Sequence, residues 1–297
     1  MRIRFSSDEG RTWSDADRFS DGSVVDGAPF EANDPTNEMS EGIILTCPNN
    51  DLLVHGRENN NRQYYGTWQF RSRDGGRSWQ NEGRILGRLG IRTSLGHTVV
   101  GKTIYLPLML YDHEPPTLGS SSTLELYKSE DNGKTWLHVS RIAGPADPVN
   151  ETGIEHLDAT TLITVHRTKN ERNTLLRRSD DMGKTWGALV DLGKEVGAVQ
   201  QPRLRRFPDE PGRLYLFGRD RIEEHIQRNC LWFSDDDGKS WTRVPLDERM
   251  FSDTGYGDAL KRRDGSLYFM GYRGTDDEAE MWRYLLRPQI DEIPAPK

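Results

Sequence analysis

The stretch SDDMGKTW at residues 179–186 decides the fold, because close copies of it recur along the chain. All copies fit one pattern, Ser-x-Asp-x-Gly-x-Ser/Thr-Trp. The others are SSDEGRTW at 6–13, SRDGGRSW at 72–79, SEDNGKTW at 129–136 and SDDDGKSW at 234–241. Successive aspartates are separated by 66, 57, 50 and 55 residues. A unit repeated at this kind of interval is typical of solenoids and propellers.

Each copy has the chemistry of a hairpin turn. An aspartate carboxylate accepts hydrogen bonds from backbone N–H groups of its own turn. The glycine two residues later tolerates the positive φ that a tight turn often demands. The tryptophan then offers a large apolar face to a neighbouring element. Strand-like segments lead into the copies at 66–71, 123–128, 174–177 and 229–233.

Each repeat also contains an earlier pair of strand-like segments, such as 42–47 with 52–56, and Leu157 with 162–166. Four short strands in each period of about 50 to 60 residues make one blade of a propeller. The sequence therefore predicts an all-β fold, with residues 1–297 forming a single β-propeller domain.

The repeated motif resembles the Asp-box, or bacterial-neuraminidase (BNR) repeat, of the sialidase-like superfamily. In that superfamily the box joins the third and fourth strands of a blade, on the edge remote from the active site. The resemblance therefore implies that the five aspartates brace turns and take no part in catalysis. It extends over about residues 1 to 287, with its parts in the same order.

The number of blades has two interpretations. Segments 258–262, 266–272 and 280–286 read as the first three strands of a further blade without a box, which makes six units. The first unit, however, begins at its third strand, because residues 2–6 lead straight into a box. We expect six blades of the sialidase type, the first incomplete at the N-terminus. The alternative is five blades, with the N-terminal strands completing the C-terminal one.

The composition agrees with a fold of short strands and solvent-exposed loops, since only 34% of the residues are hydrophobic and 29% are charged. A net charge of −7 argues against general binding to nucleic acid or to an anionic membrane. Cys47 and Cys230 are too few for a disulfide framework and are expected to be buried thiols. No cluster of histidine, cysteine and aspartate has metal-ligand spacing, so neither a metal nor another cofactor is expected.

The N-terminus, MRIRFSSDEG, lacks the apolar segment and cleavage site of a signal peptide. A cytoplasmic location is expected if Met1 is the true start of the protein, and secretion is the expectation if the N-terminus is truncated. The sequence leaves the oligomeric state open.

Two segments resemble parts of the sialidase active site. Glu151 and Arg167, sixteen residues apart, resemble a glutamate and an arginine that sialidases carry on successive strands. Tyr256, in DTGYGDALK, resembles the Gly-Tyr segment that bears the sialidase nucleophile. The resemblance implies that Tyr256 is the nucleophile, Glu151 its base and Arg167 a substrate-binding residue.

A third segment supplies a further arginine. Arg228 lies 28 residues before Tyr256, a spacing in keeping with the family, and Arg219 and Arg221 in FGRDR are rivals for the same role. Asp253, three residues before Tyr256, is the candidate acid. Taken singly, each of these residues also fits an ordinary structural role, and their joint order and spacing favour the functional interpretation.

The implied chemistry is specific. A sialoside carries a carboxylate on its anomeric carbon, so a carboxylate nucleophile would be repelled. A neutral tyrosine hydroxyl avoids this repulsion, and a nearby glutamate takes its proton. Arginine forks bind a carboxylate bidentately. We therefore expect a sialidase-like glycoside hydrolase, of the exo-α-sialidase kind, for a carboxylate-bearing or polar terminal sugar of an oligo- or polysaccharide.

Two alternatives stay open. The family's first arginine and its acid aspartate precede the first box and would here fall before Met1. A site with arginines and no proton donor binds better than it cleaves, so one alternative is a non-catalytic glycan-binding propeller. The other is a polysaccharide lyase of the same fold that cleaves uronic-acid polymers, with a base among His55, His97 and His166.

Overall fold

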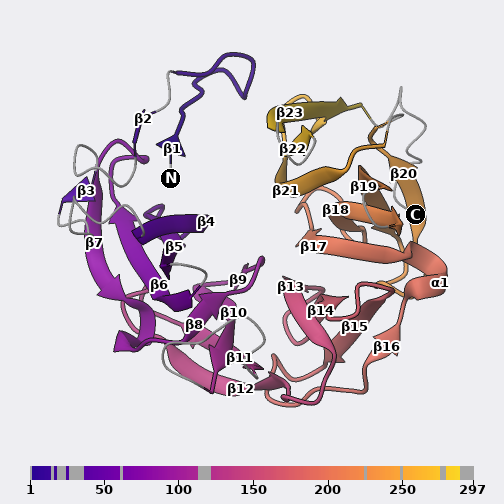
Figure 1. The fold of residues 1–297 in the computed structure, drawn as a ribbon, viewed down its shortest axis with the longest axis horizontal. Coiled ribbons are helices and arrows are strands. Elements are labelled where there is room, and N and C mark those ends of the chain that lie inside the picture. Colours follow the sequence, from indigo (N-terminus) through magenta and orange to yellow (C-terminus); the bar gives the residue numbers. More distant parts are fainter. Residues whose placement is uncertain are drawn as a thin grey trace. The chain divides into compact units, whose positions relative to one another are not determined.

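A computed structural model describes residues 2–14, 17–18, 25–26, 37–60, 63–112, 122–223, 226–247, 250–274 and 279–287. The chain divides into two compact units, Met1–Pro145 and Ala146–Lys297. Each unit holds its own sheets, which are antiparallel apart from the parallel pair β3 (Val25–Asp26) and β7 (Trp79–Arg84) (Figure 1). That residues 1–297 form a single domain stays a prediction.

The first unit contains two large sheets. One has the strand order β3 (Val25–Asp26), β7 (Trp79–Arg84), β6 (Gln63–Ser72), β5 (Leu52–Asn60) and β4 (Asn37–Thr46). The short 3-10 turn η1 (Ile85–Gly87) leads to the second sheet. That sheet contains β8 (Ile91–Thr93), β9 (Thr98–Val100), β10 (Thr103–Tyr111), β11 (Ser122–Ser129) and β12 (Leu137–Ala143). A separate pair is formed by β1 (Arg2–Ile3) and β2 (Asp17–Arg18).

The second unit contains three sheets whose strands follow one another in chain order. The first consists of β13 (Val149–His156), β14 (Leu162–Thr168), β15 (Thr174–Ser179) and β16 (Val190–Asp191). After the short helix α1 (Gly193–Val196) come β17 (Ala198–Arg205), β18 (Leu214–Glu223), β19 (Ile226–Ser234) and β20 (Thr242–Pro245). The last consists of β21 (Asp253–Lys261), β22 (Leu267–Gly274) and β23 (Ala279–Leu286). Among the described residues, no helix is long and apolar enough to cross a membrane.

These meandering sheets are propeller blades, and the all-β propeller predicted from the boxes is confirmed. The described residues form five such blades, which is the alternative count and not the expected six. The first box accounts for the difference, because it connects only the two short strands β1 and β2. The boxless C-terminal segment does supply three strands, β21 to β23.

The five boxes fold into the same turn. The aspartate Oδ1 accepts from the serine hydroxyl at 2.8 Å and from the N–H of the residue four positions later at 2.8 to 2.9 Å. The glycine has φ between 77° and 92°, and the residue before it also has a positive φ. Hydrogen bonds from the Thr185 hydroxyl and N–H lower the pKa of Asp181 to about 2. The carboxylate thus braces the turn in its charged form.

Within a unit, each of two boxes packs onto the preceding blade. Gly133, between β11 and β12, lies so close to Leu53 of β5 that a Cβ atom there would collide with it. Trp136 packs against the cluster that contains Leu53. Gly238, between β19 and β20, lies on Ile163 of β14, where an added Cβ would be 2.9 Å from Cδ1. The repeated glycine is therefore needed for close packing as well as for its φ.

The cores lie between neighbouring blades of a unit. One cluster joins the β13–β16 and β17–β20 sheets and includes Ile163, Val165, Leu204, Leu216 and Trp232. The next joins the β17–β20 and β21–β23 sheets and is aromatic: Tyr215, Phe217, Phe233, Phe269 and Tyr284. The rings of Phe217 and Phe269 stack with centroids 5.3 Å apart.

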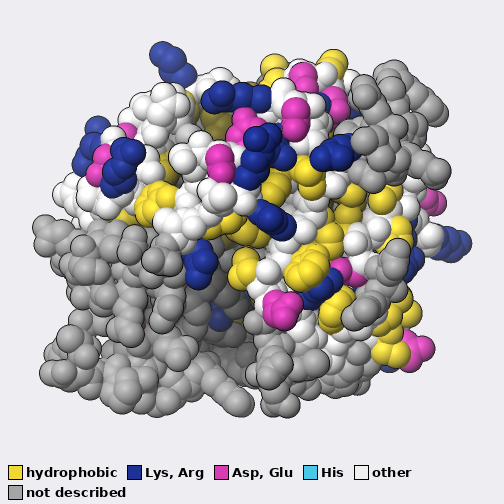
Figure 2. Space-filling model, turned by 90° about the horizontal axis from the view of Figure 1, so that it is seen from above, with side chains coloured by type: hydrophobic (Ala, Val, Ile, Leu, Met, Phe, Trp, Pro, Cys, Tyr) yellow, Lys and Arg dark blue, Asp and Glu magenta, His cyan; other side chains and the backbone are white. Residues whose placement is uncertain are grey.

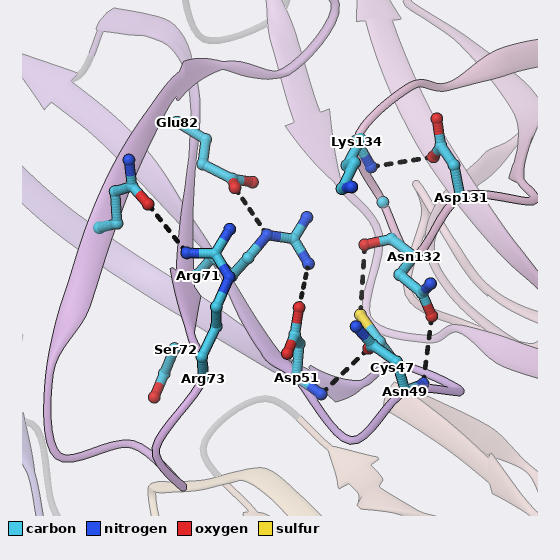
Figure 3. A network of polar contacts seen from close by, with 12 residues as sticks. Cys47, Asn49, Asp51, Arg71, Ser72, Arg73, Glu82, Asp131, Asn132 and Lys134 are labelled. Atoms are coloured by element: carbon cyan, nitrogen blue, oxygen red, sulfur yellow. Dashed lines mark hydrogen bonds and ion pairs between the residues drawn. The ribbon is translucent and has the colours of Figure 1, made fainter.

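A polar network ties β5, β6 and β7 together near their turns (Figure 3). Arg71 of β6 donates from Nη1 to Asp51 at 3.1 Å and from Nε to Glu82 at 2.6 Å. The Arg71 side chain is buried, so both carboxylates are needed to compensate its charge. Beside it, the Cys47 thiol donates to the Asn132 carbonyl of the box between β11 and β12 at 3.5 Å. The network therefore helps to join the two large sheets of the first unit.

Cys47 and Cys230 are both buried and free. Burial raises the pKa of the Cys47 thiol to about 11 and that of Cys230 to about 12. Both thiols thus stay protonated at neutral pH and are poor nucleophiles.

Candidate active site

The first strand of each sheet in the second unit is interrupted by a register shift at a similar place. The shifts lie between residues 149 and 152 in β13, 200 and 203 in β17, and 255 and 258 in β21. A bulge of this kind takes a residue out of the ladder and re-aims its side chain. The residues inside the three shifts include Glu151, Gln201 and Tyr256.

These three residues meet around one carboxylate. The Tyr256 hydroxyl donates to Glu151 Oε1 at 2.9 Å, and the Gln201 backbone N–H donates to Oε2 at 3.1 Å. Arg167 of β14 donates from Nη1 to the same Oε2 at 3.0 Å. Glu151 is 2% exposed, whereas Tyr256 is 41% exposed. A buried, fully engaged carboxylate therefore lies behind an accessible phenol.

The backbone at this point is strained. Tyr256 has φ 41° and Gln201 has φ 56°, values in the left-handed region that cost a non-glycine residue about 1–3 kcal/mol. The Gln201 side-chain carbonyl accepts the Tyr256 N–H. Gly255, with φ 126°, allows β21 to lie close to the side-chain amide of Gln201, because a Cβ atom at position 255 would collide with that side chain. The Gly-Tyr pair is thus held in a conformation that presents the phenol.

An acidic side chain links two arginines beside this group. Glu171 lies in the turn between β14 and β15 and forms ion pairs with Arg167 and with Arg221 of β18. Burial disfavours its charged form, but the hydrogen bond and charge of Arg167, together with the charges of Arg221 and Arg219, lower the pKa of Glu171 overall. Glu171 is therefore an anion at neutral pH.

A second ion pair involves the strand that carries Tyr256. Arg219 donates from Nη1 to Asp253 Oδ1, and the Tyr272 hydroxyl donates to Asp253 Oδ2 at 2.7 Å. The ring of Tyr272 is nearly parallel to that of Tyr256, with an interplanar angle of 12° and centroids 6.3 Å apart. Burial and the bond to Asp253 raise the pKa of Tyr272. Tyr272 thus remains a proton-bearing donor that fixes Asp253.

The structure places Arg228 differently from the other candidates. Arg228 pairs with Asp220 Oδ2 at 3.3 Å. Asp220 lies between Arg219 and Arg221 on β18, so its side chain points to the opposite face of the sheet. Arg219 and Arg221 therefore lie with the groups around Glu171 and Asp253, and Arg228 does not.

The histidines considered for a lyase have structural surroundings. His55 bonds to Gln69 Oε1 at 2.9 Å, and His166 lies between the hydroxyls of Thr152 and Thr164 at 2.8 and 3.0 Å. Burial lowers the pKa of His55 to about 4 and that of His166 to about 3. His97 is half-buried in the loop before β9. In the part of the chain that the structure describes, no group of three or more His, Cys, Asp or Glu side chains could hold a metal ion.

Sequence reasoning missed three residues of this arrangement, namely Gln201, Glu171 and Tyr272. For Gln201 a signal was present, because Pro202 follows it inside a strand and an internal proline marks a bulge. Glu171 and Tyr272 become relevant only through contacts that connect separate strands, and no local pattern identifies them.

Within the second unit, the arrangement lies far from the fifth box. On β18, Leu214 pairs with Ser234 of the fifth box, whereas Arg221 pairs with Gln227 at the other end of the strand. The intervening strand is roughly 23 Å long at about 3.3 Å per residue. In this blade the box thus lies at one end of the strands, and the arginines of the candidate active site lie at the other.

Residues 71–269 match the family model described as the BNR repeat-like domain, which spans more than half of the chain. The chain belongs to this family. Comparison of this BNR repeat-like protein with curated proteins gave no match.

Solved structures with the same fold include two sialidases. The Hadza microbial sialidase Hz136 superposes with a TM-score of 0.73 at 16% identity, over 96% of this chain and 59% of that one. The K499G mutant of the NanB sialidase from Streptococcus pneumoniae gives a TM-score of 0.66 at 12% identity, over 96% of this chain and 63% of that one. The BNR repeat-like protein therefore spans about three fifths of the length of these sialidases.

A third solved structure is an alpha-L-arabinanase from Penicillium chrysogenum complexed with arabinobiose. It has a TM-score of 0.56 at 19% identity, over 79% of this chain and 77% of that one. At these identities the three likenesses concern the propeller fold alone.

Proposed function

We propose that this protein is a glycoside hydrolase acting on a carboxylate-bearing or otherwise polar terminal sugar, with Tyr256 as nucleophile and Glu151 as its base. One observation carries the proposal: the accessible Tyr256 hydroxyl donates at 2.9 Å to the buried carboxylate of Glu151. A phenol is a weak nucleophile unless a neighbouring base takes its proton. The structural likeness to sialidases and to an arabinanase supports a glycosidase of this fold.

In the first step, the Tyr256 oxygen attacks the anomeric carbon as the bond to the leaving group breaks. The phenolic proton passes to Glu151 Oε1, and the leaving group takes the bonding electron pair. In the second step, water attacks the anomeric carbon, gives a proton to its surroundings and releases the Tyr256 oxygen, which recovers its proton from Glu151. The sugar therefore leaves with its anomeric configuration retained.

The contacts of Glu151 suit it to this role. Arg167 and the Gln201 N–H both donate to Oε2, and the Tyr256 hydroxyl donates to Oε1. Donors on one oxygen fix the orientation of the carboxylate before substrate arrives, which removes the need for reorganisation during the reaction. Arg167, Arg219 and Arg221 then provide donors for the polar groups of the sugar.

Asp253 has a positioning role in this proposal. Both of its oxygens already accept hydrogen bonds, from Arg219 and from Tyr272. It would have to give up Arg219 before it could protonate a leaving group. The reaction should therefore be tested with activated substrates, whose leaving groups depart without a proton.

The test uses 4-nitrophenyl and 4-methylumbelliferyl glycosides of sialic acid, glucuronic acid, galactose and arabinose. Tyr256→Phe should lower kcat/KM on every accepted glycoside by a factor of about 10² or more, because the nucleophile is lost. Tyr105→Phe is the matched control, since it removes another phenol from a buried tyrosine of the first unit. Undiminished turnover by Tyr256→Phe would refute the proposal. Sugar binding without turnover at any pH would support a glycan-binding propeller instead.

A further inference from the structure

Glu171 fills the space between Arg167 and Arg221 with a carboxylate of the protein itself. One of its oxygens is bound by Arg167 Nη2 and the other by Arg221 Nη1. The Glu171 side chain is 30% exposed, compared with 15% for Arg167 and 20% for Arg221. Among these three side chains, that of Glu171 is therefore the most exposed.

The turn that carries Glu171 is short and specially shaped. Glu171 has φ 57°, and its N–H donates to the Thr168 carbonyl at 3.1 Å. The Thr168 hydroxyl donates to the Asn173 carbonyl at 2.9 Å and closes the turn. A glutamate in the left-handed region is uncommon, and such strain is typical of functional positions. The backbone thus holds Glu171 where its carboxylate reaches back to strands β14 and β18.

The carboxylate is already charged when a ligand arrives. Three arginines lie close enough to keep the pKa of Glu171 low against the effect of its burial. The charges of Arg167 and Arg221 are therefore already compensated by Glu171 when an anion approaches. The anion must either displace Glu171 or bind close to it against like-charge repulsion. A neutral sugar meets neither cost.

We infer that Glu171 is a specificity-determining residue: its carboxylate competes with the carboxylate of an acidic sugar for Arg167 and Arg221, and it leaves the affinity for neutral sugars nearly unchanged. The inference rests on the proposed function for the place where the sugar binds. It deepens that proposal by naming the residue that sets the balance between acidic and neutral substrates.

Long-range electrostatic attraction does not make up for the affinity for acidic sugars that competition with Glu171 removes. The net charge of the chain is −7. On the face shown in Figure 2, several of the Lys and Arg side chains lie beside Asp and Glu side chains. Recognition of an acidic sugar therefore depends on individual arginines, and Glu171 takes up two of them.

The test measures binding by isothermal titration calorimetry with N-acetylneuraminate, D-glucuronate, D-galactose and L-arabinose as probes. Glu171→Gln keeps the shape of the side chain and removes its charge. We expect the affinity for at least one of the two acids to rise by about tenfold or more, the value of one charge-assisted hydrogen bond. The affinities for the two neutral sugars should change by less than about twofold.

Two further variants identify the cause of the gain. Glu223→Gln is the matched control, because it makes the same charge change at an exposed position two residues beyond Arg221 on β18. It should leave the affinity for the acids unchanged. The double variant Glu171→Gln with Arg221→Met should lose the gain, since the released guanidinium is then absent.

Two results would overturn the inference. If Glu171→Gln binds neither acid more tightly, Glu171 does not compete with them. If it weakens acids and neutral sugars alike, Glu171 only holds the arginines in place. The binding measurement needs no turnover, so it is independent of the Tyr256→Phe test. If Tyr256→Phe loses activity but Glu171→Gln binds the acids no more tightly, the inference is wrong and the proposed function still holds.

Discussion

The Tyr256 hydroxyl and the Glu151 carboxylate are joined by a hydrogen bond of 2.9 Å although 105 residues separate them in the chain. Each residue lies in a bulge of the first strand of its blade, and the bulge of a third blade supplies Gln201, which contacts both. Three irregularities thus combine into one site. At two of these positions, Gln201 and Tyr256, the backbone is strained, and such strain is typical of functional sites.

The role of Glu151 as a base predicts a large kinetic effect from a small change. Glu151→Gln should lower kcat by a factor of about 10²–10⁴, because the amide cannot take the Tyr256 proton. The KM should change little, since the amide keeps the size of the carboxylate. Steady-state kinetics on an activated aryl glycoside measures both constants.

The matched control for this variant is Glu155→Gln, on the same strand and also buried. Glu155 contacts His156 and the backbone N–H of Arg206, so its charge serves the sheet. An equal loss of kcat in folded Glu155→Gln protein would show that Glu151 acts through stability and not as a base.

The arginines on β18 and β19 predict different outcomes. Arg219→Met should raise KM for a polar sugar by about tenfold, because one charge-assisted hydrogen bond is lost. Arg228→Met should leave KM within about twofold of the original value, since Arg228 pairs with Asp220 on the other face of the sheet. A larger effect from Arg228→Met than from Arg219→Met would place the sugar on that other face.

The repeat made most of the fold predictable. Five identical turn patterns fix the hairpins, and alternating short segments between them fix the strands. The blade count was less accessible, because it depends on which strands pair at the N-terminus. Residues 2–6 read as a third strand of a blade, whereas the structure gives them only a two-residue strand paired with β2. Pairing of such short segments is decided by tertiary contacts that local sequence does not contain.

The site was predictable where a motif carries it and not where contacts across blades create it. The segments around Glu151 and Tyr256 resemble family motifs. Glu171, by contrast, lies in a polar turn like many others, and its importance comes from two arginines on different strands. Sequence spacing alone could not decide whether Arg219 or Arg228 is the better candidate for binding the substrate. Their ranking follows from strand pairing, which puts neighbouring residues on opposite faces.

The box aspartates predict a particular response to acid. Asp181 has a pKa of about 2 in the folded protein against an ordinary value of 3.8, because Thr185 and Ser179 donate to its charged form. A lowered pKa contributes stability that is fully present above about pH 4 and is lost as the pH falls towards 2. Asp181→Ala should therefore lower the melting temperature at pH 7. The difference in melting temperature between this variant and the natural protein should become smaller as the pH falls from 4 to 2.

Asp180→Ala is the control for that experiment, because Asp180 belongs to the same box but only pairs with Arg178 at the surface. Its effect on the melting temperature should be small. If Asp181→Ala melts like the natural protein at pH 7, the box carboxylate does not brace its turn.

Covalent trapping tests most directly whether Tyr256 forms a bond to the sugar. An activated glycoside of an accepted sugar, fluorinated next to the anomeric carbon, slows the attack of water on the intermediate more than it slows the first step. Intact-protein mass spectrometry should then show an increase by one glycosyl residue, and peptide mapping should place it on Tyr256. A label on a carboxylate, or an unlabelled protein that still turns over the parent glycoside, would contradict the account.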